Sequence, residues 1–308
     1  MEKPIYLKGI SYEIEEPRDI HQLDELRENP ELLATLTSVG VGSYSASKRS
    51  LAELTAACAA RSLWKGKVAP ESIGLLILAS SGFGGPELGG KEIQGLIAKL
   101  GLKNAYPVGV TLSECANFIV GLSLGIDALR QGRCENVLVV SVDKIREGAT
   151  RVVPPDVSVA SDAAASVVLS TEGTGAWEVI DTEQLMIPLA YEKTAYEDFG
   201  RYLKLSVQGV TEIAARTLAA AGRKPEDFSW LITNNYNLSV SSLFAHQFGF
   251  APGRVYTANV GRYGHCFGAD SLINLADCAN EARPSPGELF CLLASGPNMW
   301  ATAVLRKV

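Results

Sequence analysis

Apolar side chains recur along the chain in two patterns, as stripes at helical spacing and as short continuous runs. The stripe formed by Leu51, Leu54, Cys58 and Leu63 predicts a helix that starts near Ser47 and ends at residues 65–66. The same spacing predicts helices over 116–131, 202–221, 238–248 and 271–281. Short apolar runs predict buried strands at 5–10, 74–79, 137–142, 161–170, 230–233, 254–257, 289–294 and 302–305. Strands alternate with helices in both halves, which indicates a layered α/β fold, although the acidic stretch up to about Leu36 predicts no clear element.

One stretch, residues 110–144, places a cysteine where a strand passes into a long helix. Val110 and Leu112 lead to the turn, Cys115 lies on it, and the helix ends before Gly132. The unpaired N–H groups and the dipole of a helix N-terminus favour a thiolate over a thiol. The position therefore suits a nucleophile, although a single cysteine in an apolar helix is more often a small core residue.

Composition narrows the class of protein. The chain has 308 residues, 47% of them hydrophobic and 20% charged, as expected for a soluble globular enzyme with one large core or two fused ones. It contains no run of eighteen apolar residues and no apolar signal region at its start, so we expect no membrane partner and a cytoplasmic location. The net charge of -6 argues against nucleic acid as a partner.

Cysteine and histidine usage is sparse. The six cysteines form no C-x-x-C pair, so the sequence suggests neither a disulfide framework nor a metal site. Of the three histidines, His246 fits a packed or surface position and His21 has no evident partner. The glycine-rich segment 80–90 lacks the Lys-Ser/Thr of a phosphate loop and predicts a loop near a pocket or a subunit interface.

A small basic cluster follows the strand at 137–142. Lys144, Arg146 and Arg151 lie on a predicted loop, where such a cluster is usually a solvated face. A contact with the phosphates of CoA or of a carrier protein is the alternative.

The elbow around Cys115 has a family resemblance. Its sequence C-A-N-F, followed by a long apolar helix and a strand that ends in Asp143, resembles the A-C-A-G-F elbow of the thiolase superfamily, above all of its ketoacyl synthase III branch. Glu114 and Asn117 stand where that branch commonly has Ala and Gly. The segment S-D-A-A-A-S-V-V-L-S at 161–170 resembles the G-D-G-A-A-A-V-V-L segment that closes the first half of the family fold.

The resemblance covers nearly the whole chain and is weakest before Ser47. It implies the thiolase fold, a duplicated five-layer αβαβα arrangement. Gly173 and Gly175 mark the expected boundary, with residues 1–172 as the half that carries the nucleophile and residues 173–308 as the second half.

Two further motifs depart from the family pattern at matching positions. The segment W-L-I-T-N-N-Y-N-L at 230–238 resembles W-L-[VI]-P-H-Q-A-N-L, with Asn234 in the place of the catalytic histidine. The segment R-Y-G-H-C-F-G-A-D-S at 262–271 resembles R-Y-G-N-T-S-A-A-S, with His265 in the place of the asparagine. In the decarboxylating branch this His and Asn together stabilise an enolate, so the exchange favours different chemistry.

Asp270 lies five residues after His265, at the start of the next predicted helix. The pattern H-x-x-x-x-D resembles a subset of these proteins that use Cys, His and Asp to move an acyl group onto an oxygen or nitrogen acceptor. There the Asp fixes the imidazole tautomer and the His takes the acceptor proton, with Asn234 as a secondary donor or pocket wall. Two alternatives stay open: Asp270 could be only a helix N-cap, and His265 could serve condensation, as in ketoacyl synthases with G-H-x-x-G-A.

The C-terminal segment A-S-G-P-N-M-W at 294–300 resembles the G-G-G-F-x-W-G ending of the family. The resemblance implies an oxyanion hole made by the N–H groups of Cys115 and Gly296. Pro297 has no N–H to contribute.

Together these resemblances imply an acyltransferase of specialised metabolism, working as a homodimer. It would move an acyl group from CoA or an acyl carrier protein through an acyl-enzyme on Cys115 to a small-molecule acceptor. It would hold no permanent cofactor, because the donor is a CoA or phosphopantetheine thioester, and residues 82–90 would lie near the pocket mouth or the partner subunit. Three alternatives stay open: a condensing enzyme that forms a carbon-carbon bond, a non-catalytic partner subunit, and a thioesterase.

Overall fold

The computed structural model describes residues 3–82, 87–172, 176–188 and 197–308. Its largest feature is a ten-stranded sheet with the strand order β12-β11-β13-β14-β10-β1-β9-β6-β4-β5. The bounds of these strands are β1 Ile5–Ile14, β4 Ile73–Ala79, β5 Tyr106–Val110, β6 Asn136–Asp143, β9 Ala163–Ser170, β10 Trp177–Met186, β11 Phe228–Thr233, β12 Val255–Tyr256, β13 Leu289–Ser295 and β14 Met299–Lys307. Two small ribbons pair β2 (Arg18–Asp19) with β3 (Ser43–Tyr44) and β7 (Val152–Val153) with β8 (Ser158–Val159).

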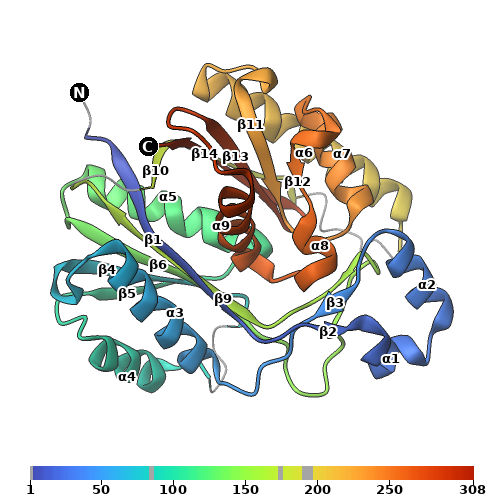
Figure 1. Ribbon diagram of the computed structural model, residues 1–308, viewed down its shortest axis with the longest axis horizontal. Helices are drawn as coiled ribbons and strands as arrows, with labels where there is room; N and C mark the ends of the chain where they lie inside the picture. Colours follow the sequence, from blue (N-terminus) through green and yellow to red (C-terminus); the bar gives the residue numbers. More distant parts are fainter. Residues whose placement is uncertain (1–2, 83–86, 173–175, 189–196) are drawn as a thin grey trace.

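The helices of the described residues surround this sheet (Figure 1). Their bounds are α1 Asp24–Arg27, α2 Pro30–Ser38, α3 Leu51–Gly66, α4 Gly90–Leu100, α5 Asn117–Arg130, α6 Phe199–Ala221, α7 Leu238–Phe248, α8 Ala258–Tyr263 and α9 Asp270–Ala282. Two single 3-10 turns matter for the site: η3, Glu114–Ala116, directly precedes α5, and η7, Phe267–Ala269, directly precedes α9.

The sheet consists of two halves with the same topology. In the first half, β5, β4 and β6 run parallel, and β9 and β1 follow in alternating directions. In the second half, β12, β11 and β13 run parallel, and β14 and β10 follow in the same way. An antiparallel pairing of β1 with β10 joins the two halves into one sheet.

The helices of the two halves also correspond. In each half, one helix follows the third strand of the half and enters the centre of the molecule: α5 after β5, and α9 after β12. Both contact strands of both halves, while α3 and α4 pack on the first half and α6 and α7 on the second (Figure 1). This is the five-layer αβαβα arrangement of the thiolase fold, and that prediction is confirmed.

The main core lies between the central helices and the strands of both halves. From α5 it takes Phe118, Ile119 and Leu122, and from α9 it takes Leu272 and Ile273, all nearly or fully buried. Each such side chain contributes roughly 1.5–3 kcal/mol of burial free energy, so the two central helices are fixed firmly against each other. The site depends on the N-terminal ends of these two helices.

Most predicted elements lie within a few residues of the observed ones. The predicted helix 238–248 has the bounds of α7, and the helix predicted near Ser47 begins after Ser50, whose side chain and that of Glu53 form a capping box. The sequence analysis missed α4 and β10. Gly173 and Gly175 lie outside the described residues, so the division into residues 1–172 and 173–308 stays a prediction. Within the described residues, no helix is both long and apolar enough to span a bilayer.

Candidate active site

Cys115 lies on a tight elbow between β5 and α5. Glu114 adopts a left-handed backbone conformation with φ of 50°, which turns the chain sharply just before the cysteine. The side chain of Asn117 accepts the N–H of Ser113 at 2.8 Å and closes the elbow. As a result, Cys115 sits half-buried at the start of α5, in the turn η3.

His265 and Asp270 lie on a second elbow, before α9. Phe267 adopts the left-handed conformation here, with φ of 53°, and the Asp270 carboxylate accepts the N–H of Cys266 at 2.8 Å. The backbone of His265 is held from the other half of the fold: its N–H donates to the Val159 carbonyl at 2.9 Å, and its carbonyl accepts the N–H of Ser161 at 2.8 Å. The imidazole is therefore fixed by both halves.

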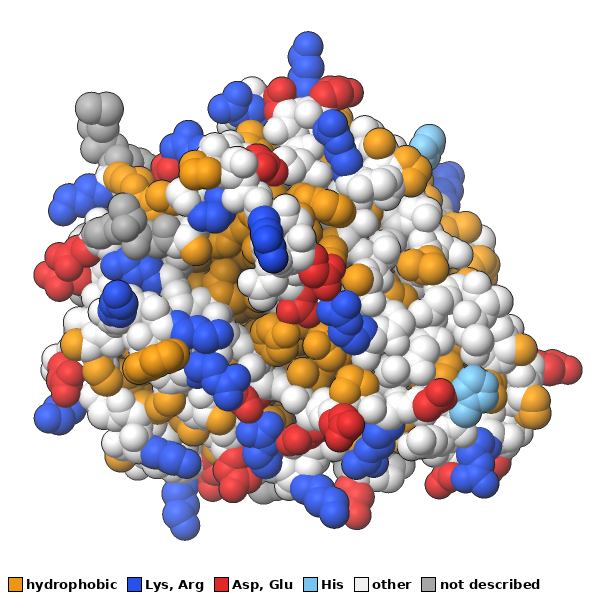
Figure 2. Space-filling view, viewed as in Figure 1, with side chains coloured by type: hydrophobic (Ala, Val, Ile, Leu, Met, Phe, Trp, Pro, Cys, Tyr) orange, Lys and Arg blue, Asp and Glu red, His pale blue; other side chains and the backbone are white. Residues whose placement is uncertain are grey.

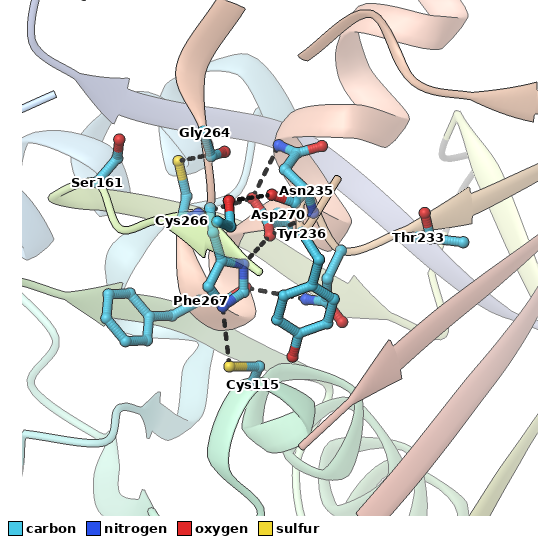
Figure 3. Close-up of polar contacts among 12 residues, drawn as sticks. Cys115, Ser161, Thr233, Asn235, Tyr236, Gly264, Cys266, Phe267 and Asp270 are labelled. Carbon is cyan, nitrogen blue, oxygen red and sulfur yellow. Dashed lines mark hydrogen bonds and ion pairs between the residues drawn. The ribbon is translucent and has the colours of Figure 1, made fainter. Parts of the chain in front are cut away.

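The two elbows bring the three predicted side chains into one line (Figure 3). The Cys115 Sγ lies 3.1 Å from His265 Nε2, and His265 Nδ1 lies 2.6 Å from Asp270 Oδ2. His265 and Asp270 have no exposed surface. Because the carboxylate accepts the Nδ1 proton, Nε2 is the nitrogen that exchanges a proton with the sulfur.

Asp270 has more contacts than an N-cap would have. Its carboxylate also accepts the backbone N–H of Asn235 at 2.9 Å and the Asn235 side-chain amide at 3.0 Å. Asn274 in turn bonds Asn235 and the Thr233 carbonyl. Asp270 is the first residue of α9, after the N-cap Ala269, so the alternative that it serves only as an N-cap is wrong.

Electrostatics favour a protonated His265. Burial alone would lower the pKa of His265, but the negative charges of Cys115 and Asp270 outweigh it and raise that pKa to about 10. A protonated imidazole at neutral pH places a positive charge 3.1 Å from the Cys115 sulfur.

Asn234 lies beside this line but its observed contacts go to the backbone. Its side-chain oxygen accepts the Ser295 N–H at 2.9 Å, and its amide donates to the Phe267 carbonyl at 3.2 Å. It thus ties the end of β13 to the second elbow. Both roles expected for Asn234, as a secondary donor or as part of the pocket wall, stay predictions.

Gly296 corrects an expectation. Its N–H donates to the Met299 carbonyl at 2.7 Å and closes the turn between β13 and β14, so it is not a free donor for an oxyanion. Glycine is needed here for another reason, because a Cβ would lie 2.9 Å from the Cβ of Glu114. The first elbow therefore packs directly against this turn.

Two aromatic residues that the sequence analysis did not select enclose the imidazole. The rings of Tyr236 and Phe267 lie 4.6 Å and 5.3 Å from that of His265. The Tyr236 hydroxyl donates to the Ser295 carbonyl at 2.5 Å. The one available signal was that Tyr236 stands where the resembling segment has Ala.

The other candidates lie away from this line. His21 contacts Asp19 on the surface, and His246 is exposed. Figure 2 shows histidine side chains, in pale blue, on the molecular surface. Arg151 forms an ion pair with the buried Asp162, at 3.0 Å, so its charge is already compensated.

The basic cluster of Lys144, Arg146 and Arg151 lines a surface cavity of about 620 Å³ together with Lys48. A phosphate contact there stays a prediction, as does the place of residues 82–90, of which 83–86 lie outside the described residues. Within the described part of the chain, no three His, Cys, Asp or Glu side chains are grouped so that they could hold a metal ion.

Comparison with protein families gives two matches, separated by residues 186–217. Residues 111–185 match the family described as 3-oxoacyl-[acyl-carrier-protein (ACP)] synthase III, and residues 218–307 match the family described as its C-terminal part. The first range contains Cys115, and the second contains His265 and Asp270.

Individual relatives agree with these matches. The chain is 24% identical over 279 residues to the beta-ketoacyl-[acyl-carrier-protein] synthase III of Aquifex aeolicus, covering 85% of both chains. It is 26% identical over 284 residues to that of Synechocystis, covering 84% of both. Among solved structures, the acyltransferase ChlB3 superposes with a TM-score of 0.86 at 19% identity, over 99% of this chain and 98% of the other. The synthase III of Aquifex aeolicus superposes at 0.80 with 19% identity, over 98% and 99%. These superpositions show a shared fold.

Proposed function

Because the chain belongs to the ketoacyl synthase III family of the thiolase superfamily, we propose that it is an acyltransferase that forms an acyl-enzyme on Cys115. The observation that carries this proposal is the line of contacts from Cys115 through His265 to Asp270, at 3.1 Å and 2.6 Å. The donor is a thioester of CoA or of an acyl carrier protein, and the acceptor is a hydroxyl or amine of a small molecule in specialised metabolism. The names of the relatives include the acyl carrier protein, and this supports a carrier-protein thioester as the acyl donor.

In the first half-reaction, the Cys115 thiolate attacks the thioester carbonyl and a new sulfur-carbon bond forms. The intermediate collapses, the bond to the donor sulfur breaks, and the leaving thiolate takes the proton from His265 Nε2. Acylation also removes the thiolate charge that helped to raise the pKa of His265 above its usual value. The imidazole is therefore left neutral at the moment when a base is needed.

In the second half-reaction, neutral His265 takes the proton of the acceptor as its oxygen or nitrogen attacks the Cys115 thioester. Asp270 keeps the Nδ1 proton in place and stabilises the imidazolium that forms. Expulsion of the Cys115 thiolate then restores the resting ion pair.

Carbon-carbon condensation is the second candidate, favoured by the synthase names of the relatives. Carbon dioxide release from a malonyl thioester that depends on His265 would support it over transfer to oxygen or nitrogen.

A homodimer through β5 is also part of the proposal. This strand forms one edge of the sheet; its first residue, Tyr106, is 72% exposed, and Leu112, two residues after its end, is 82% exposed. An unpaired edge with exposed apolar side chains suits pairing with a second copy. Light scattering of the purified protein would give twice the 32.8 kDa mass of the chain, and a monomer would contradict the proposal.

Intact-protein mass spectrometry tests the acyl-enzyme. The protein is incubated with a panel of acyl-CoA and acyl-carrier thioesters, beside Cys115→Ala as the matched control. We expect a mass gain equal to the acyl group that Cys115→Ala lacks, and its loss when the correct hydroxyl or amine acceptor is added. A gain that survives the substitution contradicts the assigned nucleophile. No gain with any thioester favours a non-catalytic subunit, and rapid loss of the adduct without an acceptor favours a thioesterase.

A further inference from the structure

Acyl transfer through Cys115 needs hydrogen-bond donors for the oxyanion. The fold does not supply one of them where the family resemblance places it. The tetrahedral intermediate carries a full negative charge on oxygen, and each donor aimed at that oxygen typically contributes about 10²–10³ in rate. The Gly296 N–H is used by the Met299 carbonyl at 2.7 Å, and Pro297 has no N–H. Of the two expected oxyanion donors, only the backbone N–H of Cys115 then remains.

The Tyr236 hydroxyl can supply the second donor, because a phenol O–H rotates about its C–O bond whereas the Gly296 backbone N–H is fixed in its turn. Tyr236 belongs to the segment between β11 and α7, and its ring lies against the imidazole of His265 at 4.6 Å. Figure 3 shows its hydroxyl end on the side of the imidazole that faces Cys115. In the resting structure this hydroxyl donates to the Ser295 carbonyl, directly before Gly296, at 2.5 Å.

The protonation state of Tyr236 also suits a hydrogen-bond donor. Burial, together with the negative charge of Cys115, raises the pKa of Tyr236 well above its usual value. The hydroxyl therefore stays protonated and can donate a hydrogen bond to a negatively charged oxygen.

We propose that Tyr236 is a further catalytic residue, whose hydroxyl donates a hydrogen bond to the oxyanion formed when Cys115 attacks a thioester. This inference rests on the proposed acyl transfer. It assigns to a side chain the task that the family resemblance gave to the Gly296 backbone.

The step balances without another reactant. As the sulfur-carbon bond forms, the π electron pair of the carbonyl moves onto its oxygen, and the Tyr236 hydroxyl turns from the Ser295 carbonyl to this oxyanion while keeping its proton. When the intermediate collapses, the carbon-oxygen double bond re-forms and the donor sulfur leaves with the His265 proton. The Tyr236 hydroxyl then returns to the Ser295 carbonyl.

The test compares two reactions of the same sulfur. Acylation by a thioester passes through an oxyanion, whereas alkylation by iodoacetamide is a direct displacement at carbon and forms none. Tyr236→Phe keeps the ring against His265 and removes only the hydroxyl. Tyr256→Phe is the control, because it removes another tyrosine hydroxyl from a buried residue, on β12, whose ring packs against Trp230 rather than His265.

We expect Tyr236→Phe to lower the single-turnover acylation rate at saturating thioester by about 10²-fold. Its alkylation rate and the concentration of thioester needed for half-saturation stay at the level of the unsubstituted protein. Tyr256→Phe keeps both rates.

Three results would overturn the inference. Unchanged acylation in Tyr236→Phe removes the hydroxyl from the mechanism. An equal fall of acylation and alkylation means that Tyr236 only positions the sulfur and the imidazole. An equal fall in Tyr256→Phe shows a general effect of losing a buried hydroxyl. Failure of the proposed function is distinct, since the unsubstituted protein would then form no acyl adduct with any thioester while iodoacetamide still alkylates Cys115.

Discussion

In the first elbow an amide, Asn117, accepts the N–H of Ser113 at 2.8 Å, and in the second elbow a carboxylate, Asp270, accepts the N–H of Cys266 at 2.8 Å. Both acceptors stand four residues after their donors and begin a central helix. Each elbow also has one left-handed residue other than glycine, with φ of 50° in the first and 53° in the second. The same backbone device has therefore been built twice, with an amide in one half and a carboxylate in the other.

The residues at matching places show how the chemistry is divided. Aligned on the left-handed residue, Cys115 corresponds to Gly268, and Leu112 corresponds to His265. The second elbow lacks a side chain where the first presents its sulfur, and a Cβ at Gly268 would lie 3.4 Å from Phe118 of α5. Both elbows therefore need a side-chain hydrogen-bond acceptor at the start of the helix. The negative charge of Asp270 goes beyond this need and acts on His265.

The largest expected effect comes from making the second elbow like the first. Asp270→Asn keeps an oxygen for the Cys266 N–H but removes the charge that fixes the imidazole tautomer. We expect acyl transfer to fall by about 10³–10⁴-fold, as for the matching change in a Ser-His-Asp triad, with a cooperative thermal transition retained. Single-turnover transfer and a melting curve measure the two effects. Full activity in this variant would show that the carboxylate is only a backbone acceptor.

The converse substitution sharpens the comparison. Asn117→Asp places a carboxylate where the Asn117 amide now faces the Thr111 carbonyl at 3.3 Å. We expect it to lower the free energy of unfolding by about 1–3 kcal/mol, because a buried donor is lost and two acceptors face each other. Urea unfolding measures the loss. A stability equal to that of the unsubstituted protein would mean that the two elbows accept either group.

Gly268→Ala tests how closely the elbows must meet. The added Cβ would lie 2.7 Å from the Ser141 hydroxyl and 3.4 Å from the backbone nitrogen of Phe118, so either the Ser141 side chain rotates away or the second elbow shifts. We expect overpacking to cost about 1–3 kcal/mol of unfolding free energy. A displacement of His265 by about 1 Å lowers acylation by about 10²-fold. Retained acylation at reduced stability would separate the packing of the elbow from the position of the imidazole.

The His265 charge predicts a dependence of stability on pH. The pKa of His265 is raised from 6.5 to about 10 in the folded protein, so its contribution is fully present below pH 6.5 and is lost as pH rises toward 10. The free energy of unfolding should therefore decline across this window more steeply than in His265→Asn. Urea titrations at several pH values give both slopes, and parallel slopes would contradict the raised pKa.

The smallest effect concerns the strand ends beside the elbows. Ser141 pairs with Ala79, and Leu293 pairs with Thr233, so Asp143 and Ser295 hold equivalent places in the two halves. Burial raises the pKa of Asp143 to about 7, although its carboxylate accepts the N–H of Ser81 at 2.7 Å.

The amide in Asp143→Asn can still accept that N–H and carries no charge. Because the folded pKa is raised, the stability that Asp143 contributes at low pH is lost as pH rises through about 7. We expect Asp143→Asn to be more stable than the unsubstituted protein at pH 8. The gap should shrink at low pH, and a constant gap would contradict the titration.

Sequence patterns predicted the site residues that belong to local motifs. The place of Cys115 at a helix start and the spacing of His265 and Asp270 are local features, and the structure brings all three together. Helical periodicity likewise predicted α7 and most of α5, because their apolar stripes face a single core. The helix α4 was missed because it begins within a glycine-rich stretch that reads as a loop.

Contacts between distant segments could not be predicted in this way. Asn235 meets Asp270, and Asn274 meets Asn235, only because β11 and α9 lie side by side. Neither amide belongs to a motif with a spacing rule. Tyr236 was overlooked because an aromatic residue after a buried strand ordinarily belongs to a core. The Gly296 expectation failed because the pairing of β13 with β14 decides which N–H groups remain free.

The contact between Cys115 and His265 spans 150 residues of chain. A chain that lacks its second half therefore has no imidazole beside the sulfur. The proposed acyl-enzyme chemistry requires both elbows to be in place, so it depends on completion of the whole sheet.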